Sequence, residues 1–206
     1  LGEGRDLFLV AFLNLAVCGL ALSTLTTRFV FPQFSLEGRR LWILAMSPLP
    51  LPRIIYQKFA SGAVACSLLV TAILLISGIS LQLPWSEIAF FAVAVIALAT
   101  GLNALAVGLG VIFPNLEESN TAKMVSGFGG TLCLVASFAF IGGLIMALVY
   151  ARWDVFATNQ VDPFWLEGQR GRTGMGAAAA LTLITTTLPL LFAKKVLKRL
   201  EILADL

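Results

Sequence analysis

Five long stretches of apolar residues alternate with shorter polar segments along this chain. None of the stretches contains Asp, Glu, Lys or Arg. They run from Leu7 to Thr27, Phe59 to Leu83, Ile88 to Phe113, Met124 to Tyr150 and Thr173 to Ala193. A helix needs about 20 apolar residues to cross a bilayer, and these stretches lack the period-two alternation of barrel strands. The pattern therefore predicts an all-α polytopic membrane bundle of five transmembrane helices, forming a single transmembrane domain over residues 1–206.

Composition excludes the main alternatives to a membrane protein. The 206 residues are 59% hydrophobic and 12% charged, whereas soluble domains carry roughly 25% charged residues. Histidine is absent, which removes the commonest general base and metal ligand. The three cysteines lie in apolar stretches without the spacing of a zinc site or a disulfide framework. We therefore predict no catalytic, cofactor-binding or metal-binding residue in the chain.

Basic residues predict the orientation of the helices. If the five helices alternate in direction, ten Lys and Arg residues fall on one side of the membrane and four on the other. The positive-inside rule places the richer side, with stretch 28–58 and the C-terminus, in the cytoplasm, most simply across the plasma (inner) membrane. Trp85, Tyr150, Trp153 and Trp165 fall at or beyond the opposite face, as interfacial aromatic residues do. With five helices and a cytoplasmic C-terminus, the first helix begins on the outside of the membrane. This arrangement predicts a preceding helix, so that the chain would be the C-terminal part of a longer protein.

Two connecting stretches, 28–58 and 151–172, are longer than simple turns require. In the first, the spacing of Leu41, Leu44 and Ala45 predicts a short helix from Ser35 to Met46, with Ser35 as its N-cap. Three prolines follow, at positions 48, 50 and 52, and favour an extended link to the next helix. On the residues alone, this helix is either an amphipathic segment lying on lipid headgroups or a lever that docks onto a partner.

Residues 28–58 also resemble a known family. Phe31-Pro32-Gln33-Phe34-Ser35-Leu36-Glu37-Gly38-Arg39-Arg40-Leu41-Trp42, followed by Ser47-Pro48 and Lys58, is similar to the cytoplasmic loop of ATP-binding-cassette type-2 permeases, closest to the exporter branch. A weaker similarity covers residues 101–130, around Gly108-Leu109-Gly110-Val111-Ile112-Phe113-Pro114. The resemblance implies a permease subunit of an ATP-driven exporter, whose five helices are the second to sixth of a set of six.

The resemblance also implies partners. The sequence contains no G-x-x-x-x-G-K-[ST] loop, so we expect no ATPase activity in this chain and place ATP and Mg²⁺ in a separate ABC ATPase subunit. The expected contacts to that subunit are Glu37, Arg39, Arg40 and Trp42. Glu117, Glu118 and Lys123 form a possible second contact, although Asn115 and Glu118 also match a plain capping box. Other expected partners are a second permease subunit, making a dimer, and the lipid bilayer, with no nucleic acid.

Polar residues inside the predicted helices are few. Asn14 and Asn103 are the strongest, and they serve either as interhelical hydrogen-bonding groups or as the lining of a transport path. The absence of ionisable groups argues against coupling to protons or ions. Small residues spaced four apart on the third helix predict close helix packing, with a dimer interface as one candidate location. These pairs are Ala97 with Gly101, Ala104 with Gly108, and Ala106 with Gly110.

Two other functions remain open from the sequence. A membrane-embedded enzyme acting on lipid would need a nucleophile, base or metal, and Glu117 with Glu118 is the only adjacent acidic pair. A membrane scaffold or assembly protein without transport activity needs no such residues. The sequence does not identify a transported substrate.

Overall fold

Every regular element that the structure describes is a helix. The computed structural model of the chain describes residues 3–38, 51–115, 120–153 and 169–204. In chain order the helices are α1 (Glu3–Leu25), η1 (Thr26–Val30), α2 (Gln33–Gly38), α4 (Leu51–Ser80), α5 (Trp85–Ile112), α6 (Thr121–Ser126), α7 (Phe128–Ala151) and α9 (Gln169–Ala204). Five helical spans are long and apolar enough to cross a membrane: Phe8–Leu36, Ile55–Ser80, Trp85–Ile112, Phe128–Ala151 and Gln169–Leu197. The predicted all-α bundle of five transmembrane helices is confirmed.

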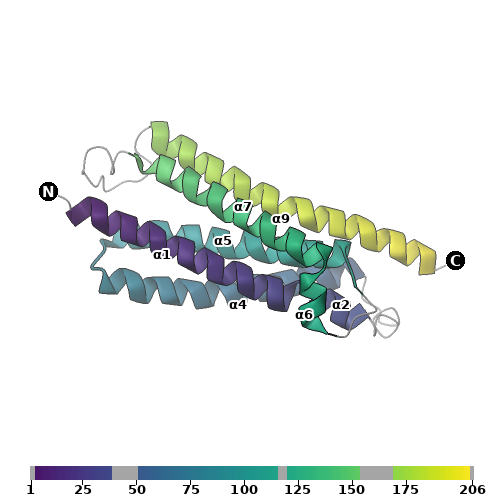
Figure 1. Cartoon of the computed structure of the whole chain (residues 1–206). Coiled ribbons are helices and arrows are strands. Elements are labelled where there is room, and N and C mark those ends of the chain that lie inside the picture. Colours follow the sequence, from purple (N-terminus) through teal and green to yellow (C-terminus); the bar gives the residue numbers. More distant parts are fainter. Residues whose placement is uncertain (1–2, 39–50, 116–119, 154–168, 205–206) are drawn as a thin grey trace.

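The five long helices lie lengthwise beside one another (Figure 1). One end of the bundle contains η1, α2 and α6, together with the C-terminal end of α9, and we call it the η1/α6 end. The other end contains the start of α1, the turn between α4 and α5, and the start of α9, and we call it the Glu87 end. The described parts of the segments that were predicted to be cytoplasmic therefore lie together at the η1/α6 end.

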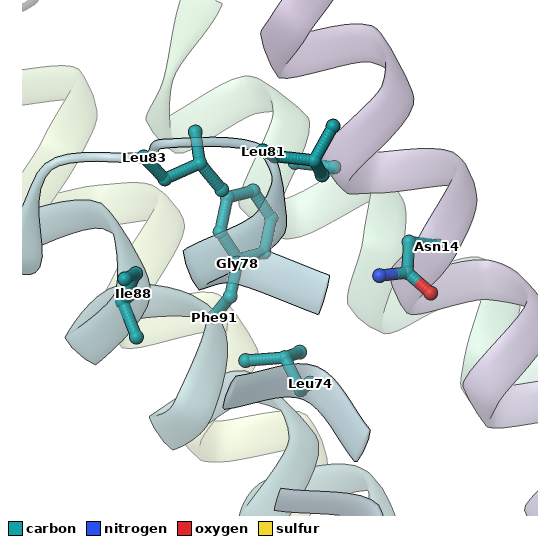
Figure 2. A pocket seen from close by; sticks show the side chains of 8 residues that line it. Asn14, Leu74, Gly78, Leu81, Leu83, Ile88 and Phe91 are labelled. Carbon is teal, nitrogen blue, oxygen red and sulfur yellow. The ribbon is translucent and has the colours of Figure 1, made fainter. Parts of the chain in front are cut away.

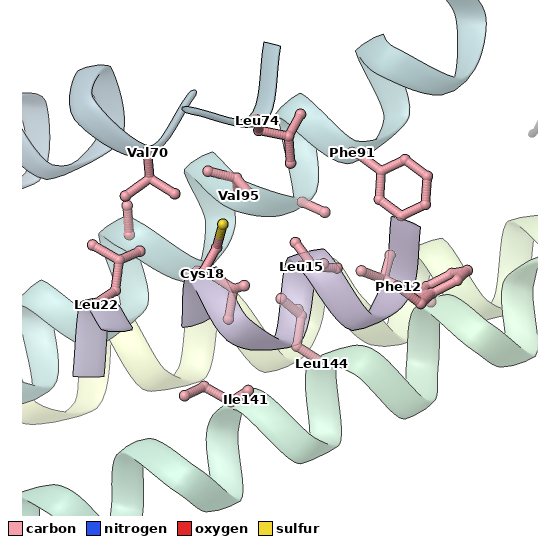
Figure 3. Packing of buried hydrophobic residues seen from close by; sticks show 14 of the residues in the cluster. Phe12, Leu15, Cys18, Leu22, Val70, Leu74, Phe91, Val95, Ile141 and Leu144 are labelled. Carbon is pink, nitrogen blue, oxygen red and sulfur yellow. The ribbon is translucent and has the colours of Figure 1, made fainter. Parts of the chain in front are cut away.

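Helix α5 forms the centre of the bundle. It packs against α1, α4, α7 and α9, and 67% of its most apolar stretch is buried, compared with 17% for the spans in α4 and α9. The core at its Glu87 half joins Leu15 and Leu22 of α1 to Val95 of α5 and Leu144 of α7 (Figure 3). Because α4 and α9 expose most of their apolar side chains, these two helices provide much of the surface available to lipid.

Glycines allow α5 to approach its neighbours closely. A Cβ atom at Gly108 would collide with Pro189 of α9, including the Pro189 backbone. Gly101 lies in the same way against the Phe140 ring, and Gly110 against the Phe31 carbonyl. The prediction of close packing by small residues is confirmed, but these glycines are buried within the chain and not in an interface between two copies.

Helix boundaries differ from the predictions near the prolines. Helix α4 begins at Leu51, so Pro52 lies in its first turn and not in an extended link. A proline is tolerated there because the first N–H groups of a helix have no intrahelical acceptor. Pro48 and Pro50 lie outside the described residues. Helix α9 continues through Pro189, which seats against Gly108.

Candidate functional site

The η1/α6 end begins with a change in helix geometry after α1. At η1 the backbone widens to a π-helical turn, in which the Phe31 N–H donates to the Thr26 carbonyl at 3.0 Å. The Thr26 hydroxyl donates to the Leu22 carbonyl at 2.9 Å, and both Thr26 and Thr27 are buried. Local π-helical turns occur frequently at functional sites. This turn buries the Phe31 side chain and leaves Phe29 exposed.

Helix α2 is fixed to the segment that follows α5. The Asn115 backbone N–H donates to the Ser35 hydroxyl at 3.1 Å, and Ser35 is buried. Helix α2 begins at Gln33, so the prediction of Ser35 as an N-cap is wrong: its hydroxyl binds a neighbouring segment and not the start of its own helix. Glu37 belongs to this helix. The other predicted contacts, Arg39, Arg40 and Trp42, lie outside the described residues, as does the rest of the predicted helix.

Helix α6 also lies at the η1/α6 end of the bundle. Its N-cap is Asn120, whose side-chain oxygen accepts a hydrogen bond from the Ala122 N–H at 3.0 Å. Lys123 is exposed in the middle of the helix, and Met124 is buried beneath it. Glu117 and Glu118 lie outside the described residues.

A cavity of about 440 Å³ opens between η1 and α6. It is lined by Arg28, Phe29, Thr121, Ala122, Val125 and Ser126. A guanidinium group beside an exposed aromatic ring and hydroxyl groups can receive an acidic or hydrogen-bonding side chain of a partner. The sequence prediction emphasised the segment after Gly38 and missed this cavity, although Arg28 at the end of an apolar stretch was a visible signal.

The two intramembrane asparagines make interhelical hydrogen bonds. The Asn14 amide of α1 donates to the Ser77 hydroxyl of α4 at 2.6 Å. The Asn103 amide of α5 donates to the Phe59 carbonyl of α4 at 2.7 Å, and its side chain lies directly against Gly62. Asn103 is fully buried, and Asn14 lies at the edge of a cavity of about 10 Å³ (Figure 2). Both residues therefore join α4 to its neighbours, and the cavity that Asn14 lines has room for about one water-sized probe.

A buried ion pair at the Glu87 end was missed by the sequence analysis. Glu87 lies in the first turn of α5 and Arg152 directly after α7, and their side chains form a hydrogen-bonded salt bridge. Glu87 is 0% exposed and Arg152 4% exposed. The expectation of a bundle interior without ionisable groups is therefore wrong. It failed because both residues were assigned to loops, whereas α5 and α7 extend far enough to bury them.

These features define the chain as an all-helical polytopic membrane protein with a cavity of mixed polar and apolar lining at one end and a buried ion pair at the other. The chain belongs to the family described as "Putative ATP-binding cassette", whose model matches residues 7–202. No match was found among the curated proteins or among the solved structures.

The family match contradicts several functional predictions. The family description names an ATP-binding cassette and not a permease, so the assignment as a permease subunit of an exporter is not retained. The same description contradicts the expectation that ATPase activity, ATP and Mg²⁺ belong only to a partner subunit. That expectation depended on the absence of one consensus loop and on a similarity densest over residues 28–58. A match over nearly the whole chain outweighs both, and it does not support the scaffold alternative either.

A nucleotide site makes specific demands on the side chains and backbone around it. ATP with Mg²⁺ needs backbone amides and a lysine for the phosphates and oxygen ligands for the metal. Within the described ranges, no group of three or more His, Cys, Asp or Glu residues could hold a metal ion, and the Glu87 carboxylate is engaged by Arg152. The described residues therefore do not supply the donor groups that such a nucleotide site needs.

Proposed function

We propose that residues 1–206 act as a single membrane-embedded unit of an ATP-binding-cassette system. The observation that carries this proposal is the family match, because residues 7–202 include all five membrane-length helices. The bundle exposes broad apolar surfaces on α4 and α9, which suits a lipid bilayer as its surroundings. A second copy of the chain is a further proposed partner.

The η1/α6 end is proposed to face the cytoplasm. Arg28, Lys123 and the lysines of α9 lie at this end, on the side that carries ten of the fourteen basic residues. Trp85, Tyr150 and Trp153 lie at the Glu87 end and are 75%, 52% and 51% exposed, as interfacial aromatic residues are. Both distributions favour an orientation with the C-terminus inside, and the plasma membrane is the proposed location.

We propose that movement of a partner is transmitted to the bundle through the η1/α6 end. Helix α2 continues from α1 through η1 and is bonded to the segment after α5 by Ser35, while α6 leads into α7 through Gly127. A displacement of this end is therefore transmitted to three membrane-length helices at once. Glu37, Arg39, Arg40 and Trp42 are the proposed first contacts with the moving partner surface, and Glu117, Glu118 and Lys123 the second.

Cysteine labelling in intact cells tests the orientation. A single cysteine is introduced as Thr121→Cys at the η1/α6 end or as Trp153→Cys at the Glu87 end, in a Cys66→Ala background. Cys18 and Cys133 are buried and stay in place. We expect a membrane-impermeant maleimide to label the Trp153→Cys protein in intact cells and the Thr121→Cys protein only after permeabilisation. The reverse pattern would overturn the proposed orientation.

Nucleotide dependence tests the membership in an ATP-driven system. In inverted membrane vesicles, the labelling rate of the Thr121→Cys protein is compared with and without MgATP, with Trp153→Cys in right-side-out vesicles as the control. Photolabelling with an azido-ATP identifies the polypeptide that holds the nucleotide. We expect at least a twofold change in rate at position 121. An unchanged rate in vesicles that hydrolyse ATP through this system would refute the proposed route of coupling.

A further inference from the structure

We propose that Glu87 and Arg152 form a conformational latch that holds α1, α5 and α7 together at the Glu87 end. In this proposal, the bundle opens at that end only when the ion pair separates. The inference rests on the geometry of the pair and its surroundings, and it does not depend on where ATP binds.

The ion pair connects two helix termini with favourable polarity. Glu87 lies in the first turn of α5, where the helix dipole favours an anion. Arg152 caps the end of α7, where the dipole favours a cation, and its backbone N–H donates to the Leu148 and Val149 carbonyls. Each charge is therefore stabilised by its own helix as well as by its partner, in the closed arrangement that the structure shows.

The remaining polar atoms of the pair complement one another. The Arg152 Nη2 atom donates to Glu87 Oε1, while Arg152 Nε and Glu87 Oε2 are buried without another partner. These four atoms are the ones that a side-on, two-bond pairing of guanidinium and carboxylate uses. A small rotation completes the second bond, so the pair needs no outside ligand in the closed state. Separation would leave two charges in an apolar site, which is strongly unfavourable until water or new partners reach them.

Aromatic rings from α1 and α5 enclose the ion pair. The Arg152 guanidinium carbon lies 5.3 Å from the centre of the Phe8 ring and 5.7 Å from that of Phe90. The cation therefore contacts α1 as well as α5, which adds a third helix to the latch. Phe91 joins this cluster, with its ring centre 6.3 Å from that of Phe8 and 5.3 Å from that of Phe90.

A small cavity borders the aromatic cluster. Phe91 lines the cavity of about 10 Å³ between α1, α4 and α5, together with Asn14, Gly78 and Ile88 (Figure 2). This volume is about that of one water-sized probe, so the packing beside the Phe91 ring is incomplete. The Glu87 end thus has a strong, directional contact beside a locally incomplete packing.

Distance measurements between spin labels test the latch. Labels are attached after Trp85→Cys on α5 and Trp153→Cys beyond α7, both at exposed positions that flank the ion pair. The Cys66→Ala background keeps labelling specific. For the parent protein in lipid nanodiscs we expect one dominant short separation. For Glu87→Gln we expect the population with a longer separation to rise by about tenfold or more, since one charge then lacks its partner in any closed state.

Two further variants keep the test decisive if Glu87→Gln does not fold. The neutral double variant Glu87→Gln with Arg152→Gln leaves no unpaired charge and should still show the longer separation. The exchanged variant Glu87→Arg with Arg152→Glu should shift the distribution back toward the short separation, although each charge then opposes its helix dipole. Asn120→Ala, which removes the N-cap of α6 at the opposite end of the bundle, should leave the distribution unchanged. A parent-like distribution in the neutral double variant would overturn the proposal.

Discussion

Replacing Gly108 by alanine should separate the two most extensively paired helices of the bundle, α5 and α9. A Cβ atom at this position would collide with the Pro189 side chain and come within 2.8 Å of its carbonyl carbon. Rotation of a side chain cannot relieve contact with a backbone, so the helices must move apart. Overpacking of this kind costs about 1–3 kcal/mol, and the better helix propensity of alanine returns up to about 1 kcal/mol. Because the Pro189 backbone cannot rotate away, the cost lies in the upper part of this range, at about 2–3 kcal/mol, and the expected net loss is about 1–2 kcal/mol.

The matched control is Gly142→Ala on α7. Gly142 is also a helical glycine, but no atom lies within 4 Å of the position that its Cβ would occupy. Only the gain in helix propensity remains there, so we expect no loss of stability, or a gain of up to about 1 kcal/mol. In a protein of this size, about 1 kcal/mol corresponds to a shift of about 2–4 °C in Tm.

Thermal unfolding in a mild detergent, followed by circular dichroism, measures both variants. We expect the Tm of Gly108→Ala to fall by about 2–8 °C relative to the parent, while that of Gly142→Ala stays level or rises slightly. Equal Tm values for the parent and Gly108→Ala would contradict the close approach of α5 to Pro189. Equal losses in both variants would show that alanine is unfavourable for reasons unrelated to helix packing.

Three smaller perturbations probe other contacts. A double-mutant cycle with Asn14→Ala and Ser77→Ala should give a coupling energy of about 0.6–2 kcal/mol from unfolding curves, and a value near zero would argue against their hydrogen bond. Asn120→Ala should remove about 0.5–2 kcal/mol of local stability and raise hydrogen exchange within α6 but not in α5; unchanged exchange would mean that the cap is dispensable. A membrane-permeant maleimide should modify the half-buried Cys66 faster than the fully buried Cys133, and the opposite order would be inconsistent with the packing of α7.

The helical architecture was predictable because lipid imposes a simple rule on sequence. A segment of about 20 apolar residues must satisfy its backbone internally. The five apolar stretches give the five helical spans, with shifts of at most four residues at every end except the C-terminal end of the first, which extends nine residues farther. Close packing at Gly101, Gly108 and Gly110 was predictable from spacing. The partners of these glycines were not, because Phe140, Pro189 and Phe31 come from elements far along the chain.

The features near the helix ends were harder to predict. Glu87 and Arg152 are 65 residues apart, and a charged residue beside an apolar stretch ordinarily lies in water. Their burial depends on how far α5 and α7 extend and on which helices meet there. Ser35 shows the same difficulty, since its spacing fits an N-cap while its hydroxyl binds the distant Asn115. Functional assignment from a short loop failed for a related reason, because a few residues cannot identify a component within a multi-part system.

The π-helical turn at η1 sets the direction in which α2 leaves the membrane-length part of α1. Such a turn holds one residue more than an α-helical turn, and each residue of an α-helix advances by about 100°. Loss of a single residue between Thr26 and Val30 would turn everything beyond it by roughly a quarter of a circle about the axis of α1. Ser35 would then face away from Asn115, and the tie between the first helix and the central one would be broken while every transmembrane segment kept its sequence. The orientation of α2 about the axis of α1 therefore depends on the number of residues in one short turn, which a hydropathy profile does not show.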